Sequence, residues 1–92
     1  MLQIHFSRQF KKDYKKILRN KKALRCLQEV ISILAQNKIL DKKYYNHFLK
    51  GAYQEYQECH VLPDLLLIYK IDNNRLALFL IRVSTHLKIF NK

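Results

Sequence analysis

The hydrophobic pattern of this chain changes its period part-way along. In the first half, apolar residues recur at the spacing of an amphipathic helix, as at Phe10, Tyr14 and Ile17. From residue 52 onward, aliphatic and aromatic residues gather in short runs that are typical of β-strands. Because the period decides which face of an element can be buried, the sequence predicts two helices followed by a sheet, an α+β fold.

The N-terminal half predicts a strand and two helices. Residues 2–6 alternate between apolar and polar side chains, which indicates a short half-buried strand, and Ser7 offers an oxygen to cap a following helix. That helix is expected to end near Asn20. A second apolar stripe predicts another helix over 21–36, so that the two helices form a hairpin across residues 20–22. The second stripe consists of Leu24, Leu27, Val30, Ile31 and Leu34.

The C-terminal half predicts three strands. Residues 37–50 show no clear period and are rich in Lys, Tyr and Asn, which indicates a connecting loop that reaches Gly51. The strands are expected over 53–61, 65–71 and 76–83. The expected order of elements is therefore β-α-α-β-β-β, with the two helices packed on one face of a mostly antiparallel sheet.

Two short polar segments between these strands are predicted to be turns. They are Leu62-Pro63-Asp64 and Asp72-Asn73-Asn74-Arg75. The Asn pair tolerates positive φ and therefore suits a tight hairpin. Because the chain has one Gly and one Pro, we expect order nearly throughout, in a single domain that spans residues 1–92.

The balance of charge indicates a polyanionic partner. The chain holds 18 Lys and Arg against 7 Asp and Glu, a net charge of +11. Residues 1–50 carry 13 basic and 3 acidic side chains, whereas residues 51–92 carry 5 and 4. A positive electrostatic field of this kind favours binding to nucleic acid. An acidic protein tail or an anionic membrane surface would respond to the same charge, and a solvated helical face would also account for it. The residues expected to bind RNA phosphates are Lys11, Lys12, Lys15 and Lys16.

The sequence is typical of a cytoplasmic protein. Cys26 and Cys59 are its only cysteines, and their number and spacing fit neither a disulfide framework nor a zinc site. The N-terminus has no signal-peptide pattern, and no apolar run reaches the roughly 18 residues that a membrane span needs. We therefore expect a reducing compartment and no membrane partner.

Polar side chains gather near the turn after the first long strand. Tyr56, Glu58 and His60 share one face of that strand by the period of two, and the hairpin brings Asp64 back toward the same end. A carboxylate and an imidazole in this position suit acid–base chemistry. They are equally consistent with a solvated rim. His5 faces away from the apolar side of its own strand and is expected to be structural or solvated.

A second polar group follows the last long strand. Arg82, Ser84 and His86 alternate to one side if that strand runs on, and Phe90 lies near the end of the chain. Packing alone would also account for these residues. Placed beside the first group, they complete a set of imidazoles, carboxylates, a guanidinium and an aromatic ring.

That set contains what metal-free RNA cleavage requires. A base takes the proton of the ribose 2′-OH, the alkoxide attacks the adjacent phosphorus, and an acid protonates the leaving 5′-oxygen. Histidine suits both roles because its unperturbed pKa of about 6.5 lies close to working pH. Arg82 would hold the phosphorane oxygens, and Phe90 or Tyr56 would stack on a splayed base. No metal ion and no cofactor is expected.

The run GAYQEYQECHVLPDLLLIYK, from Gly51 to Lys70, resembles the signature of YafQ-type toxins in the RelE/ParE superfamily. In that signature an acidic residue, His, Val, Pro and Asp precede an aliphatic strand that ends in Ile-Tyr-Lys. Two positions depart from it, because Glu58 stands where Asp is frequent and Leu65 where Trp is usual. Matching residues outside the run extend the resemblance over essentially the whole chain. They are His47, Leu49, Arg82, Thr85, His86 and Phe90.

The resemblance implies a RelE-like microbial ribonuclease-type fold and a toxin that inhibits translation by cutting messenger RNA in the ribosomal A site. It also implies a cognate antitoxin whose acidic segment folds onto the basic surface. The missing Trp moves the expected stacking role to Phe90. The residues that the resemblance places in the site are His47, Glu58, His60, Asp64, Arg82, His86 and Phe90.

Three functions are compatible with the sequence. The first is a ribosome-dependent endoribonuclease, and the second is a ParE-like inhibitor of DNA gyrase that shares the fold without nuclease chemistry. The third is an RNA-binding module without catalysis. The pattern of His and Asp residues favours the first, because the other two functions leave those side chains without a role.

Overall fold

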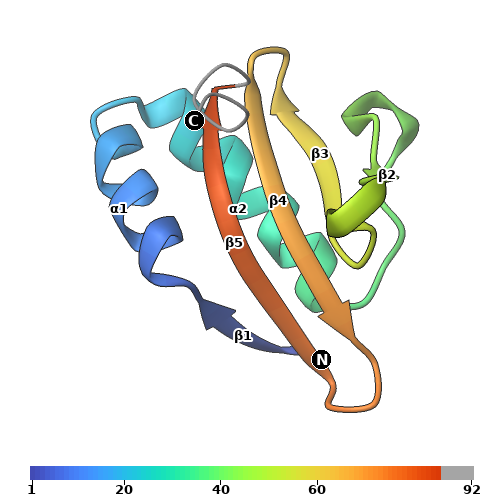
Figure 1. Cartoon of the computed structure of the whole chain (residues 1–92). Helices are drawn as coiled ribbons and strands as arrows, with labels where there is room; N and C mark the ends of the chain where they lie inside the picture. Colours follow the sequence, from blue (N-terminus) through green and yellow to red (C-terminus); the bar gives the residue numbers. More distant parts are fainter. Residues whose placement is uncertain (86–92) are drawn as a thin grey trace.

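The computed structural model describes residues 1–85, which form two helices and a five-stranded sheet (Figure 1). The two helices follow the first strand and precede the other four. Two short 3-10 turns, η1 and η2, flank the shortest strand. In chain order the elements are β1 (Gln3–Phe6), α1 (Arg8–Ile17), α2 (Lys21–Ala35), η1 (Lys42–Tyr44), β2 (His47–Phe48), η2 (Gly51–Tyr53), β3 (Gln57–Leu62), β4 (Leu65–Asp72) and β5 (Ala77–Thr85).

The strands lie in the order β1-β5-β4-β3-β2. Neighbouring strands are antiparallel except β1 and β5, the first and last strands, which pair in parallel. The predicted α+β fold, with two helices on a mostly antiparallel sheet, is confirmed. In Figure 1, α2 lies behind the sheet and α1 lies along the edge of β5.

The core lies between the helices and one face of the sheet. Leu27 and Val30 of α2 are fully buried, as are Leu67 of β4 and Leu78 of β5. Cys59 of β3 joins them, and burial, assisted by the neighbouring Glu58 carboxylate, raises the pKa of its thiol to about 12. The thiol is therefore an inert core group. Within residues 1–85, neither helix is long and apolar enough to cross a membrane.

Side-chain caps set where the two helices begin. The Ser7 hydroxyl accepts a hydrogen bond from the backbone N–H of Phe10 at 2.9 Å, which confirms the predicted cap. The first helix ends at Ile17, not near Asn20 as predicted, because the Asn20 side chain caps α2 by accepting from Ala23 N at 3.0 Å. The hairpin therefore turns over residues 18–20, two residues earlier than predicted.

The segment over 37–50 is more ordered than the expected loop. It contains η1 and the two-residue strand β2, which pairs antiparallel with β3. The following strand begins at Gln57 instead of residue 53, because η2 occupies Gly51–Tyr53. Gly51 has φ +69°, a left-handed conformation that glycine adopts without a steric penalty.

The hairpin between β4 and β5 closes differently from the prediction. The residue with positive φ is Leu76, at +51°, and neither Asn73 nor Asn74 adopts this conformation. The carboxylate of Asp72 accepts from the backbone N–H groups of Asn74 and Arg75 at 3.1 and 3.3 Å. This Asx-type turn keeps the Asn pair at negative φ and moves the left-handed residue to the end of the loop.

A β-bulge shifts the register in the middle of β5. Ile68 pairs with Arg82 while Tyr69 pairs with Leu80, so Ile81 is the extra residue. Ser7 binds this region from the edge of the sheet, because its N–H donates to Leu80 O at 3.0 Å and its hydroxyl donates to Ile81 O at 2.6 Å. The residue that caps α1 therefore also anchors the bulge.

Asp13 attaches α1 to the end of β5. Its side chain is 2% exposed and accepts from Val83 N at 3.1 Å and from Arg82 Nε and Nη2, both at 3.1 Å. Gln9 Nε2 adds a fourth hydrogen bond at 3.0 Å. The buried carboxylate thus meets one cation and satisfies an N–H on the edge of β5 that extends beyond β1.

Replacement of Asp13 by Ala is expected to lower the free energy of unfolding by about 3 kcal/mol. This value is the lower end of the range for breaking a buried ion pair, because Arg82 stays partly hydrated. The matched control is Glu55→Ala, which removes the exposed Lys70–Glu55 pair at 3.5 Å and should cost less than about 1 kcal/mol. Urea denaturation measures both values. Equal stability of the two variants would show that the Asp13 cluster does not hold the fold.

Candidate active site

The strand register places the predicted polar residues in two rows on one face of the sheet. The first row is His47, Glu58, Ile68 and Arg82, and the second is His60, Leu66 and Ser84. Residues paired in register point to the same side of a sheet. Alternate residues, such as Cys59 and Leu67, belong to the core under the helices, so the two rows lie on the opposite face. The predicted alternation of Arg82 and Ser84 is confirmed.

His47 and Glu58 form the closest contact between predicted site residues. His47 Nε2 lies 3.2 Å from Glu58 Oε1, and His47 Nδ1 lies 2.8 Å from the carbonyl oxygen of Tyr45. Glu58 is 5% exposed, and its Oε2 atom has no hydrogen-bond partner within the described part of the chain. Among the described residues, the imidazole of His47 is thus the side chain that contacts this carboxylate, and Oε2 can accept from another donor.

The partners of His47 fix the orientation of its ring. Its two nitrogens face two oxygen atoms, Nδ1 the carbonyl oxygen of Tyr45 and Nε2 the carboxylate of Glu58. An imidazole can donate through either nitrogen. The loop carbonyl and the strand carboxylate therefore hold the ring between them.

His60 lies near this pair but has different neighbours. Its Nδ1 is 3.3 Å from Pro63 O, and its ring meets the Tyr45 ring edge-on with centroids 5.6 Å apart. Its side chain is partly exposed on the same face as Glu58. Tyr45 therefore contacts both imidazoles, through its carbonyl at His47 and through its ring at His60.

The structure gives Arg82 a definite partner. Its side chain is 27% exposed and its guanidinium is paired with Asp13 through Nε and Nη2. A guanidinium has five N–H donors, of which Asp13 takes two. Asp13 therefore fixes the direction of the guanidinium and leaves donors for a second anion.

The other residues predicted to belong to the site have no contact with the His47–Glu58 pair that the described structure shows. Asp64 is exposed in the turn between β3 and β4, and the next residue, Leu65, pairs with Thr85. Tyr56 precedes β3 rather than lying within it, and its ring is 6.5 Å from that of Tyr53. His86 and Phe90 lie outside the described residues. His5 is exposed and stacks on Phe79 at 4.9 Å, at the far edge of the sheet.

The four lysines expected to bind phosphates are all exposed on α1. They lie beside β5, whereas His47 lies on β2, three strand spacings of roughly 4.8 Å each away. The basic surface of α1 and the His47–Glu58 pair are thus separate parts of the molecule. These lysines are Lys11, Lys12, Lys15 and Lys16.

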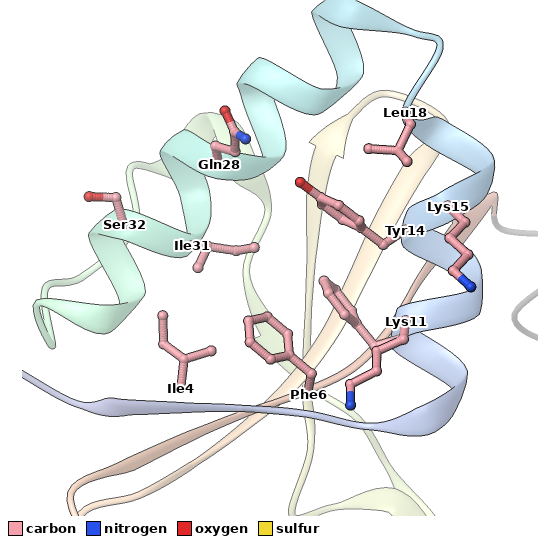
Figure 2. Close-up of a pocket in the computed structure, with 10 residues that line it drawn as sticks. Ile4, Phe6, Lys11, Tyr14, Lys15, Leu18, Gln28, Ile31 and Ser32 are labelled. Atoms are coloured by element: carbon pink, nitrogen blue, oxygen red, sulfur yellow. The ribbon is translucent and has the colours of Figure 1, made fainter.

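An apolar groove of about 770 Å³ opens between α1, α2 and β1. Figure 2 shows Ile4, Phe6, Tyr14 and Ile31 facing one another across this groove, with Lys11 and Lys15 on the α1 side. Phe6 and Leu18 stay about half exposed there. The groove combines an apolar floor with a cationic rim, and neither His47 nor His60 lines it.

No metal centre is formed within residues 1–85. In that part of the chain, no three His, Cys, Asp or Glu side chains come close enough together to hold an ion. His47 and Glu58 form a pair without a third ligand of this kind.

Sequence reasoning missed two residues, Asp13 and Tyr45. A signal for Asp13 was present: it is the one acid among residues 1–28, and it lies three residues after Phe10, next to the apolar stripe of the helix. Tyr45 had no such signal, because its importance comes from a left-handed backbone and a loop conformation that no period reveals.

Comparison with known proteins identifies the family. The family described as "Bacterial toxin of type II toxin-antitoxin system, YafQ" matches residues 2–91. This chain belongs to the YafQ family. The mRNA interferase toxin YafQ of Escherichia coli K12 is 33% identical over 88 residues, which cover 95% of this chain and 94% of that protein.

Solved structures of bacterial toxins have the same fold. A metal-bound toxin from Helicobacter pylori is 41% identical with a TM-score of 0.89, covering 98% of this chain and all of that one. YafQ in the Escherichia coli DinJ–YafQ complex is 32% identical with a TM-score of 0.88, covering 99% of this chain and all of that one. The predicted RelE-like fold and membership of a type II toxin family are confirmed.

Proposed function

We propose that this chain is a cytoplasmic endoribonuclease toxin that inhibits translation by cutting messenger RNA on the ribosome. The observation that carries the proposal is the His47–Glu58 contact, on the same face of the sheet as His60. Membership of the YafQ family and the name of the Escherichia coli relative, an mRNA interferase, support it.

The proposed chemistry is acid–base catalysis by histidines. One imidazole removes the proton of the ribose 2′-OH, and another protonates the leaving 5′-oxygen after the alkoxide has attacked phosphorus. The Glu58 carboxylate would orient the imidazole of His47 for this transfer, and His60 is partly exposed close by. His86 is the third imidazole that we assign to the site.

We also assign roles to Arg82, Asp64 and Phe90. The N–H donors of Arg82 that Asp13 leaves available would bind the phosphorane oxygens. Asp64, in the exposed turn after β3, would orient an imidazole or the ribose. Phe90 would stack on a base of the message.

The proposed protein partner is a cognate antitoxin. The net charge of +11 favours an acidic segment, and the groove between α1, α2 and β1 offers an apolar surface with Lys11 and Lys15 at its rim. A related toxin is known in complex with DinJ. An acidic amphipathic segment would cover the groove and neutralise the lysines that we assign to the ribosome.

A ParE-like action on DNA gyrase is the alternative. It would leave the His47–Glu58 contact without a role, whereas RNA cleavage uses it. Mapping of new 5′ ends on translated messages beside a gyrase supercoiling assay distinguishes the two functions. Inhibition of supercoiling without new 5′ ends would support the alternative.

Replacement of His60 by Ala is expected to lower cleavage of ribosome-bound message by about 10²–10⁴-fold, the usual contribution of a proton-transfer group. Because the side chain is partly exposed, thermal unfolding should change little. His5→Ala is the matched control, since it removes an imidazole at the opposite edge of the sheet. Full cleavage by folded His60→Ala protein would remove His60 from the mechanism.

Cleavage is expected to persist in EDTA at a concentration that leaves ribosomes intact, because the proposed acid, base and cation are side chains. A related toxin is described as metal-bound, so the assay must separate metal binding from metal-dependent cleavage. Rates are compared in EDTA with and without added Zn²⁺, Cu²⁺ or Mg²⁺. Recovery of activity with one of these ions alone would contradict the mechanism.

Reversal of charge at Lys11, Lys12, Lys15 and Lys16 to Glu is expected to weaken ribosome binding without moving the cuts. Each lost phosphate contact should reduce the log–log salt dependence of binding by about one unit, since fewer counterions are released. Co-sedimentation with ribosomes at several salt concentrations measures this slope. Lys38→Glu, exposed beyond α2, is the control. Unchanged sedimentation of the fourfold variant would assign these lysines to the antitoxin instead.

A further inference from the structure

A second pocket opens beside His60, at the side of the molecule away from the apolar groove. It has a volume of about 650 Å³ and lies between α2, η1 and the turn after β3. This volume is within the range of roughly 300–1,000 Å³ that small-molecule sites have. Its lining includes Glu29, Lys43, Tyr44, Tyr45, His60 and Pro63, and the proposed chemistry uses only His60 of these.

Tyr45 lies at the mouth of this pocket in a costly conformation. Its φ is +49°, in the left-handed region that bulky residues rarely adopt. Two hydrogen bonds hold it there: its N–H donates to Lys42 O at 3.0 Å, and its carbonyl accepts from His47 at 2.8 Å. The ring is 70% exposed and yet lies against His60. The loop therefore presents an aromatic surface next to an imidazole that we assign to catalysis.

The wall of the pocket offers polar groups at fixed positions. The Tyr44 hydroxyl donates to Glu29 Oε1 at 3.2 Å. Burial, with the hydrogen bond to Glu29 as the next cause, raises the pKa of Tyr44, so the phenol remains a donor at neutral pH. Glu29 Oε2 is then available to accept an N–H from a ligand. The Lys43 ammonium, 5.1 Å from the centre of the Tyr44 ring, adds a cation suited to a phosphate.

We propose that this pocket binds the nucleobase of a nucleotide adjacent to the scissile phosphate, which stacks on Tyr45 and donates an N–H to Glu29. The inference rests on the proposed RNA cleavage, because the pocket shares His60 with the proposed site. Single-stranded RNA is recognised in this manner, with unstacked bases lying on aromatic rings and their edges bonded to side chains. Tyr45 thus contributes affinity, and Glu29 contributes preference among bases.

The test of stacking compares Tyr45→Asn with Tyr45→Phe. Asn tolerates the left-handed backbone and keeps the carbonyl at His47 but removes the ring, whereas Phe keeps the ring. The probe is a ribosome programmed with a 2′-O-methylated message that carries 2-aminopurine in the A-site codon, since the blocked 2′-oxygen prevents cleavage. Stacking quenches the fluorescence of 2-aminopurine. We expect quenching by the parent and by Tyr45→Phe, and none by Tyr45→Asn.

Cleavage of an unmodified message distinguishes two roles for Tyr45, binding of a base and positioning of His47 or His60. A stacking residue holds the ground state and transition state alike, so Tyr45→Asn should raise KM by roughly 5- to 150-fold with kcat preserved. A fall in kcat at constant KM would mean that Tyr45 merely positions His60 or His47, and would overturn the stacking role.

The test of base preference uses Glu29→Ala with Gln28→Ala as the matched control. Gln28 is the exposed neighbour of Glu29 on α2 but lines the apolar groove instead. On four messages that differ in one base of the A-site codon, Glu29→Ala should change the ranking of rates, whereas Tyr45→Asn should lower all four. An unchanged ranking in Glu29→Ala would overturn the role of Glu29.

The outcomes also separate this inference from the proposed function. If the parent cuts the message, and Tyr45→Asn cuts it and quenches 2-aminopurine as well as the parent does, the base pocket is overturned. The nuclease assignment then still stands. A parent that quenches 2-aminopurine through Tyr45 but cuts no message would overturn the nuclease assignment and support base binding. Absence of quenching by the parent overturns the base pocket in either case.

Discussion

The carboxylate of Asp13 holds together three parts of the molecule that the chain connects only distantly. It accepts from Val83 on the edge of β5, binds the guanidinium of Arg82 and receives Gln9 from its own helix. The sheet requires such an acceptor because one edge of β5 is only partly paired. β1 pairs only with residues 77–80 of β5, so the rest of that edge must find other partners for its backbone groups. Asp13 of α1 and Ser7, which caps that helix, supply them through their side chains.

This attachment also determines which side chains lie on the face of the sheet opposite the core. Ser7 binds the carbonyl of Ile81, the extra residue of the bulge, and the bulge places Leu80 and Val83 in the core while Arg82 faces the other side. Without the extra residue, strict alternation would place Leu80 and Arg82 on one face. The bulge thus reconciles an apolar core with a row that runs from His47 to Arg82.

The candidate site combines rigid strands with loops. Glu58 and His60 are on β3, in the interior of the sheet order, and their spacing is set by the pleat. Tyr45 belongs to the connection between η1 and β2, and Asp64 belongs to the turn after β3. In such connections a side chain can lie beside the sheet instead of above it. Such a division is common, because a rigid scaffold fixes some groups while loops adjust the others to the substrate. The shared contact of Tyr45 with His47 and His60 joins the two parts.

Local patterns in the sequence were enough to predict the two helices, the three long strands, the basic N-terminal half and the common face of Glu58 and His60. These features follow from local period and composition, which act within a few residues. Tertiary structure decided the parallel pairing of β1 with β5, the bulge at Ile81, the contact of His47 with Glu58 and the burial of Asp13 against Arg82, 69 residues away. These depend on which backbone edges and charges remain unsatisfied once the elements have packed. No local pattern carries that information, because the unsatisfied partner exists only in the assembled fold.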